Sequence, residues 1–229
     1  TSMVVTLEEE VLFELEGVAH TVIPAGKATS VFNEKLGVLI RSDPSVLMVS
    51  KVADEQSAKL LAGAADTTRC YVPLEQPDTL TALRSWIKQV GNPREVGETL
   101  GAVVAQRLMR RLCHTCRAPY TPDPGALKKR NLPADQGTEL FRSSGKVMVK
   151  DKEVLCPDCH GLGYRGRIAI FELMMIDEQA ARYISANELD SLRLHLRKQK
   201  MLYLQEAALT KVVEGVTDIK EVTRVMAGK

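Results

Sequence analysis

The order of apolar and polar positions predicts a mixed α/β arrangement over roughly the first hundred residues. The apolar run Val46–Val49 follows Asp43-Pro44 and has the length of a buried strand. A helix is predicted over Asp54–Ala64, and Asp78 is placed to cap another helix that Gly91-Asn92-Pro93 ends. The apolar positions of that second helix, at helical spacing, are Leu80, Leu83, Ile87 and Val90.

Helical spacing also dominates later parts of the chain. A helix is predicted from Val96 into Leu112, with Leu100 and Leu108 on one face. Residues 168–229 are predicted to be helical, with three helices whose apolar positions recur every three or four residues. Their expected boundary signals are a Ser185/Glu188 capping box before Leu189, a terminating Gly215 after Leu202–Glu214, and a Thr217 cap before Ile219.

Composition supports a folded chain and excludes several classes. The 229 residues are 45% hydrophobic and 26% charged, which is typical of a soluble globular protein. The longest stretch without Lys, Arg, Asp or Glu is Gly17–Gly26, too short to cross a membrane, and the N-terminus lacks the features of a secretory signal. We therefore expect neither a membrane span nor export.

Charge is unevenly distributed although the net charge is only +2. Residues 1–100 carry 9 basic and 14 acidic side chains, residues 101–170 carry 13 and 6, and residues 171–229 carry 9 of each. The middle third is therefore a basic region, suited to an acidic protein surface, anionic lipid or nucleic acid. A solvated basic face without a partner is an equally good interpretation.

Four of the five cysteines form two C-x-x-C pairs, Cys113/Cys116 and Cys156/Cys159, with 39 residues between them. Two such turns supply four thiolates, which is the ligand set of a closed structural zinc site. A redox role is disfavoured because two pairs are present, and the adjacent His114 and His160 are weaker ligand candidates. The glycines after Cys159 also resemble the knuckles of DnaJ-type cysteine-rich domains. Cys70 lies among apolar residues and is expected to be a small buried side chain.

Three longer motifs are Ala105–Leu112 leading into Cys113-x-x-Cys116, Cys156–Arg167 leading into Ile170–Leu173, and the tail Gln199–Thr217. They resemble the secretion ATPases that drive type II secretion and type IV pilus assembly. This resemblance implies the C-terminal part of a RecA-like P-loop NTPase α/β fold, with a tetracysteine zinc subdomain and a helical C-terminal tail. We assign residues 1–107 to the ATPase core, 108–167 to the zinc subdomain and 168–229 to the helical subdomain.

The same family pattern continues through the first hundred residues in a degenerate form. In the acidic "Asp box" segment Glu8 is kept, whereas Glu9 replaces the aspartate of the family. In the Walker B segment Ser50 replaces the glycine, Lys51 the glutamate and Ala53 the arginine. The two histidines of the "His box" fall on Thr68 and Glu75, and no G-x-x-x-x-G-K-[ST] loop occurs among these 229 residues.

These replacements predict a chain without ATPase activity and without bound ATP. Phosphoryl transfer depends on positioned charges, and Lys51 places a cation where a carboxylate is required to polarise water. We interpret Glu8 and Glu9 as surface carboxylates, Asp43 as a turn residue and Asp54 as a helix cap. Catalytic and nucleotide-binding residues are therefore not assigned, and the metal ligands are Cys113, Cys116, Cys156 and Cys159.

The hypothesis that follows is a non-catalytic scaffold or regulator of a secretion or pilus system. The resemblance implies inner-membrane platform proteins as partners, with an active ATPase paralogue, acidic lipid and a hexameric ring as further candidates, and a cytoplasmic, membrane-peripheral location. One alternative is a fragment of an ATP-binding secretion ATPase. The other is a zinc-ribbon nucleic-acid binder, disfavoured because aromatic residues are only 4% of the chain and no base-reading helix is evident.

Overall fold

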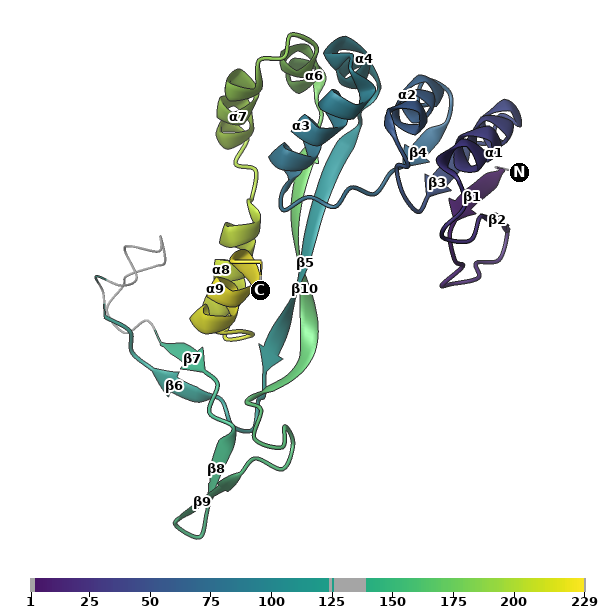
Figure 1. Cartoon of the computed structure of the whole chain (residues 1–229). Helices are drawn as coiled ribbons and strands as arrows, with labels where there is room; N and C mark the ends of the chain where they lie inside the picture. The colour runs from purple at the N-terminus through teal and green to yellow at the C-terminus, as the bar shows by residue number, and fades with distance from the viewer. Residues whose placement is uncertain (1–2, 124, 126–138, 229) are drawn as a thin grey trace. The chain divides into compact units, whose positions relative to one another are not determined.

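A computed structural model describes residues 3–123, 125 and 139–228 of the chain. The chain divides into two compact units (Figure 1). Unit 1 comprises Thr1–Val103 and Met174–Met201, and unit 2 comprises Val104–Leu173 and Leu202–Lys229. The three-part division drawn from composition and motifs stays a prediction, because it follows sequence patterns rather than packing.

Unit 1 is built on a parallel four-stranded sheet. Its strands are β1 (Val4–Glu8), β2 (Val18–Val22), β3 (Val46–Val49) and β4 (Arg69–Tyr71), in the order β2-β1-β3-β4. The strand predicted over Val46–Val49 is therefore confirmed. Leu7, Leu47 and Val49 are completely buried, because side chains of these strands meet the apolar positions of the flanking helices.

Six helices of the described chain belong to unit 1. They are α1 (Thr29–Arg41), α2 (Glu55–Ala64), α3 (Thr79–Val90), α4 (Pro93–Thr99), α6 (Glu178–Ser185) and α7 (Leu189–Lys198). Asp54 and Asp78 cap α2 and α3 through their carboxylates, and Gly91 ends α3 in a left-handed conformation. The predictions for these two helices and their caps are confirmed. Cys70, expected to be buried, is half-buried on β4 and packs against the core.

The helix predicted from Val96 into Leu112 is wrong. The chain forms the short helix α4 and then the long strand β5 (Ala102–Leu112). Leu100 and Leu108 fit a helical period by chance, and Leu108 is 57% exposed in the strand. Residues 102–112 are rich in good helix formers, but pairing with the distant strand β10 (Tyr164–Met175) overrides that local preference.

Unit 2 consists mainly of a two-stranded ribbon packed against two helices. Backbone hydrogen bonds from Ile176 to Gly101 and from Cys113 to Gly163, at the two ends of the ribbon, show that β5 and β10 are antiparallel. The helices are α8 (Leu204–Val213) and α9 (Ile219–Met226). Within unit 2 their apolar positions form one core with side chains of both strands; its most buried members are Met109, Leu140, Ala208 and Val212.

Two small antiparallel sheets complete unit 2. One joins β6 (Ala118–Tyr120) to β7 (Leu140–Arg142), and the other is the hairpin of β8 (Lys146–Val149) and β9 (Lys152–Leu155). Lys150 and Asp151 at the hairpin tip both have positive φ, which is the backbone of a two-residue turn that matches the strand twist.

Residues 168–229 are only partly helical, because β10 continues to Met175. The predicted capping box is also wrong: Ser185 is the last residue of α6, and Glu188 precedes α7 without a side-chain cap. Thr217 does not cap α9, since Asp218 does so and the Thr217 hydroxyl instead donates to the Arg110 carbonyl at 2.9 Å. The helices α8 and α9 and the terminating Gly215 agree with the sequence expectation.

Candidate metal centre

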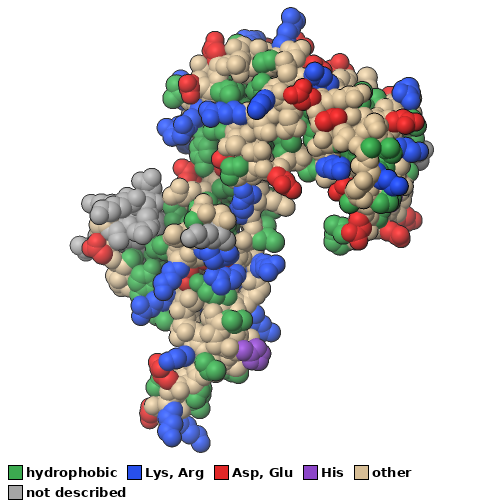
Figure 2. All heavy atoms as spheres, in the orientation of Figure 1, with side chains coloured by type: hydrophobic (Ala, Val, Ile, Leu, Met, Phe, Trp, Pro, Cys, Tyr) green, Lys and Arg blue, Asp and Glu red, His purple; other side chains and the backbone are tan. Residues whose placement is uncertain are grey.

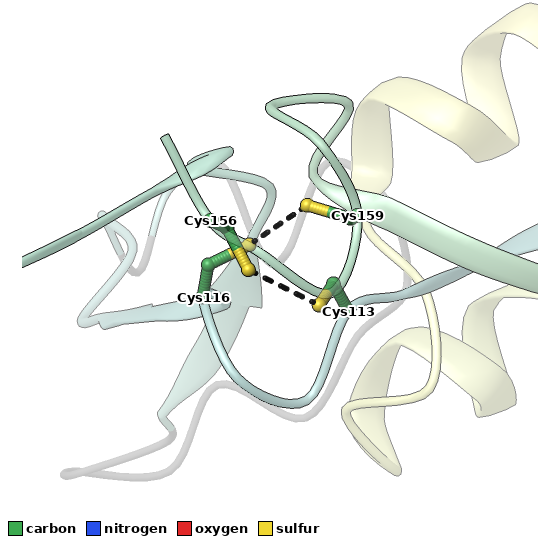
Figure 3. A group of neighbouring side chains, drawn as sticks. All are labelled: Cys113, Cys116, Cys156 and Cys159. Carbon is green, nitrogen blue, oxygen red and sulfur yellow. Dashed lines mark hydrogen bonds between the residues drawn. The ribbon is translucent and has the colours of Figure 1, made fainter. Parts of the chain in front are cut away.

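The four paired cysteines converge at the ends of four strands of unit 2 (Figure 3). Cys113 directly follows β5 and Cys116 precedes β6, whereas Cys156 directly follows β9 and Cys159 precedes β10. The Cys116 amide donates to the Cys113 carbonyl within the first C-x-x-C, and the Leu162 amide donates to the Cys159 carbonyl in the turn that follows the second. Both turns therefore aim their two thiols at one point.

The sulfur geometry fits a tetrahedral metal shell. All four cysteines are buried, and their Sγ atoms lie within 4.8 Å of one another. The Cys113–Cys156 and Cys116–Cys159 sulfur distances are 3.8 Å and 3.6 Å. A tetrahedron with Zn–S bonds of about 2.3 Å has sulfur–sulfur edges of about 3.8 Å, whereas a disulfide would require about 2.05 Å. The four side chains can hold a metal ion.

Polar groups around the cluster favour thiolate formation at one sulfur in particular. Burial raises the pKa of the Cys159 thiol, but the Gly163 amide donates to its sulfur at 3.2 Å and, with the neighbouring thiols, lowers that pKa to about 7. Burial and hydrogen bonding within the cluster raise the pKa of Cys116 to about 12. A dication supplies the charge that stabilises all four thiolates together.

Two glycines allow the backbone to close around the cluster. Gly145 has φ +78°, and a Cβ there would lie 2.2 Å from the Gly161 carbonyl oxygen. Gly163 has φ +75°, and its Cβ would lie 2.8 Å from the Ser143 side chain. The Gly145 carbonyl accepts from the Cys156 amide at 2.9 Å, so side chains at these positions would displace a ligand turn.

The two neighbouring histidines lie outside the cluster. His114 and His160 are both exposed, and neither belongs to the four-residue group found in the described part of the chain. This agrees with their lower rank as ligands. No local sequence pattern predicts the contact between the two turns, in which the Thr115 hydroxyl donates to the Asp158 carboxylate.

Buried carboxylates of α9, which sequence reasoning missed, hold the helix against the ribbon inside unit 2. Glu221 is completely buried and accepts hydrogen bonds from Arg110 and Arg224. Burial alone raises the pKa of Glu221, but these bonds outweigh it and lower the pKa to about 2. Asp218 accepts a hydrogen bond from the Tyr164 hydroxyl at 2.9 Å. Tyr164 directly follows Gly163, whose amide donates to the Cys159 sulfur. The partners of these contacts lie far apart in the sequence, so no local sequence pattern predicts them.

The positions that the sequence analysis assigned to a nucleotide site lie in unit 1: Glu8, Glu9, Ser50 and Lys51 are at the carboxyl ends of β1 and β3, whereas Thr68 directly precedes β4. Lys51 donates to the Glu9 carboxylate at 2.6 Å, and the Glu9 amide donates to the Ser50 hydroxyl at 3.2 Å. The Thr68 hydroxyl is buried and donates to the Pro44 carbonyl at 3.0 Å, whereas Glu75 is exposed. No metal-ligand group forms here among the described residues.

Glu8 differs from the surface carboxylate that the sequence predicted. Its side chain is buried and accepts from the Thr6 hydroxyl at 2.5 Å and from His20 Nδ1 at 2.8 Å. These two hydrogen bonds lower the pKa of Glu8. The correction follows from the parallel β1–β2 register, which pairs Thr6 with His20 and could not be read from local sequence.

A sequence model of the family "Type II/IV secretion system protein" matches residues 1–224. The chain belongs to this family. It is 30% identical to the type IV pilus assembly ATPase PilB of Thermus thermophilus over 95% of the chain and 24% of that protein. It is 30% identical to type II secretion system protein E of Dickeya dadantii over 97% of the chain and 42% of that protein. The resemblance stated from the motifs is confirmed.

Two solved structures with low sequence identity share the fold. The Legionella pneumophila ATPase DotB aligns with a TM-score of 0.63 at 16% identity, over 100% of this chain and 52% of that one. The pilus retraction motor PilT gives a TM-score of 0.63 at 13% identity, over 98% of this chain and 52% of that one. The chain spans less than half the length of the curated family relatives described above.

Proposed function

We propose that this chain is a non-catalytic module of a type II secretion or type IV pilus system, acting as a scaffold or regulator. Its fold is then the C-terminal part of a RecA-like P-loop NTPase, with a structural zinc centre and a helical tail. The module works at the cytoplasmic face of the inner membrane. Its partners are platform proteins of that membrane and an active ATPase paralogue, within an oligomer of the hexameric type that the family resemblance implies.

The Lys51–Glu9 ion pair is the observation that carries the proposal. The ammonium group occupies the position where the family has a water-polarising carboxylate, and it lies 2.6 Å from the adjacent acidic side chain. A cation there can neither polarise water nor leave Glu9 free to act on a metal-bound nucleotide. Thr68, buried and bonded to Pro44, adds a second replaced position without a titratable group.

The four-cysteine centre supports the proposed scaffold role, because a closed metal site stabilises structure and does not catalyse a reaction. Four cysteine ligands close the coordination shell, so bound zinc supplies no open position for substrate or water. The metal therefore stabilises β-rich unit 2, whose two small sheets contribute three or four residues per strand. Cys113 and Cys116 hold one turn, and Cys156 and Cys159 hold the other.

The proposed lack of ATPase activity and of ATP binding is tested by measuring phosphate release and calorimetric binding with Mg²⁺-ATP on the zinc-loaded chain. We expect release at the background rate and no binding heat. Mg²⁺-dependent release that falls in Glu8→Gln or Glu9→Gln variants would overturn the proposal. In the native organism, a deletion strain scored for secretion and piliation should be rescued by the Glu9→Gln variant and not by Cys156→Ser.

A further inference from the structure

The β8–β9 hairpin and the knuckle next to it expose an unusual amount of apolar surface. We refer to Lys146–Leu155 together with Leu162 as the apolar hairpin. Leu162 is 73% exposed, Leu155 67% and Met148 64%. Side chains of this size are expected to be covered by something when they gather in one place on a folded protein.

Apolar side chains occupy both faces of this hairpin. Its register pairs Val147 with Val154 and Met148 with Glu153. Met148 and Leu155 therefore point to one face, and Val149 and Val154 point to the other. The flat surface of a protein partner would cover one face and leave the other in water. The interfacial layer of a bilayer surrounds an inserted hairpin and covers both.

The charges of the apolar hairpin match an anionic surface. Lys150 and Lys152 lie at its tip and make no ion pair among the residues that the structure describes. Glu153 is paired with Lys146 at 2.8 Å, and Asp151 makes no ion pair with any residue in the described part of the chain. Unit 2 as a whole carries 17 basic and 11 acidic side chains, whereas unit 1 carries 14 and 18. Figure 2 shows Lys and Arg side chains beside hydrophobic ones on this part of unit 2.

The cysteine cluster holds both ends of the apolar hairpin. Leu155 is followed directly by the ligand Cys156, and Lys146 follows Gly145, whose carbonyl accepts from the Cys156 amide at 2.9 Å. Val147 packs against the cluster. An isolated two-stranded hairpin is marginally stable in water, so we expect these contacts with the cysteine cluster to keep this one formed (Figure 1).

We propose that the apolar hairpin inserts into the interface of an anionic lipid bilayer. Met148, Val149, Leu155 and Leu162 enter the boundary between headgroups and acyl chains, and the lysine ammonium groups extend back to the lipid phosphates. The proposal deepens the proposed function by giving its membrane-peripheral location a contact surface. It does not depend on whether the chain hydrolyses ATP.

The test is flotation of the zinc-loaded chain with vesicles in the absence of nucleotide. We expect binding to vesicles of phosphatidylcholine with phosphatidylglycerol, and at least tenfold weaker binding to phosphatidylcholine alone. The Met148→Ser/Leu155→Ser and Lys150→Glu/Lys152→Glu double variants should each bind the anionic vesicles at least tenfold more weakly. Because all four side chains are exposed, zinc content and circular dichroism should match the parent chain.

The matched control is Leu12→Ser/Phe13→Ser in unit 1. Those side chains are 73% and 78% exposed, so the control removes as much exposed apolar surface from an acidic segment. Its vesicle binding should stay within twofold of the parent. A Met148→Trp reporter should shift its emission to the blue on anionic vesicles, with the buried Trp86 as a constant background.

Three results would overturn the proposal: equal binding to neutral and anionic vesicles, unchanged binding of the hairpin variants, or no vesicle binding at all. Loss of capture of an inner-membrane platform protein by the Met148→Ser/Leu155→Ser variant, without any vesicle binding, would assign the apolar hairpin to a protein partner instead. The phosphate-release assay is independent of these readouts. Failure of one proposal is therefore distinguishable from failure of the other.

Discussion

Substitution of Glu221 by glutamine should destabilise unit 2 by about 3 kcal/mol at neutral pH. The Glu221 side chain is inaccessible to solvent, and its oxygens accept from Arg110 at 2.6–2.9 Å and from Arg224 at 2.5–2.8 Å. A carboxyl whose pKa falls from 4.5 to about 2 on folding gains about 3 kcal/mol in its charged form, at 1.36 kcal/mol per pKa unit. Glutamine keeps the shape and removes the charge between two guanidinium groups.

The free energy of unfolding is measured by urea titration with far-ultraviolet circular dichroism, and hydrogen exchange in α8 and α9 assigns the loss to unit 2. The control is Glu178→Gln, which removes an exposed carboxylate from a helical ion pair with Arg182. That control should cost about 0.3 kcal/mol. A loss below about 0.5 kcal/mol for Glu221→Gln would refute the reasoning, because a buried charge pair should cost several times an exposed one.

The pH dependence of the same variant has a definite sign. Because the folded pKa of Glu221 is depressed, its contribution is fully present above about pH 4.5 and is lost as the pH falls toward 2. The difference in unfolding free energy between parent and variant should therefore shrink through this window. Other changes at low pH affect both proteins alike, so the difference isolates Glu221.

The metal site supports three further predictions. Elemental analysis should find one zinc per chain. Chelation should release the zinc and reduce hydrogen-exchange protection around Cys156 and the β8–β9 hairpin. Unchanged protection would contradict a structural role for the metal. Gly145→Ala should lower zinc affinity at least tenfold, because the added Cβ would lie 2.2 Å from the Gly161 carbonyl oxygen. The control Gly166→Ala should retain the metal, because its added Cβ has no other atom within 4 Å. In the metal-free chain at pH 7, mass spectrometry should find Cys159 alkylated before Cys116, since the Gly163 amide donates to the Cys159 sulfur at 3.2 Å and favours its thiolate.

The cysteine cluster was predictable because its information is local. Each C-x-x-C turn places two thiols on one side of a tight turn, so Cys113/Cys116 and Cys156/Cys159 could be assigned by spacing, and the structure brings all four within 4.8 Å. Helix caps were predictable for the same reason at Asp54 and Asp78, where the carboxylate contacts an amide three residues away.

Features that depend on distant pairing were not predictable. The segment from Val96 to Leu112 has helix-forming residues at plausible helical spacing, and only its partner strand β10 makes it β5. Glu221 contacts Arg110 across 111 residues, and Glu8 is buried because β2 places His20 beside it. In each case a tertiary contact, rather than the neighbouring sequence, decides the environment of the side chain.

The unit 1 positions that we propose to be degenerate form interactions of their own. Lys51 and Glu9 neutralise each other, Ser50 accepts from the Glu9 amide, and the Thr68 hydroxyl bonds the Pro44 carbonyl. A site that had lost only one catalytic group would be expected to leave the remaining charges unpaired and open to a metal-bound phosphate. In this chain Lys51 and Glu9 form a surface ion pair worth at most about 1 kcal/mol. The Lys51→Glu substitution should therefore be tolerated by the fold. It should not restore nucleotide binding, because the new carboxylate would face the Glu9 carboxylate without a cation between them. Calorimetric ATP binding by Lys51→Glu would show instead that Lys51 alone blocks an otherwise competent site.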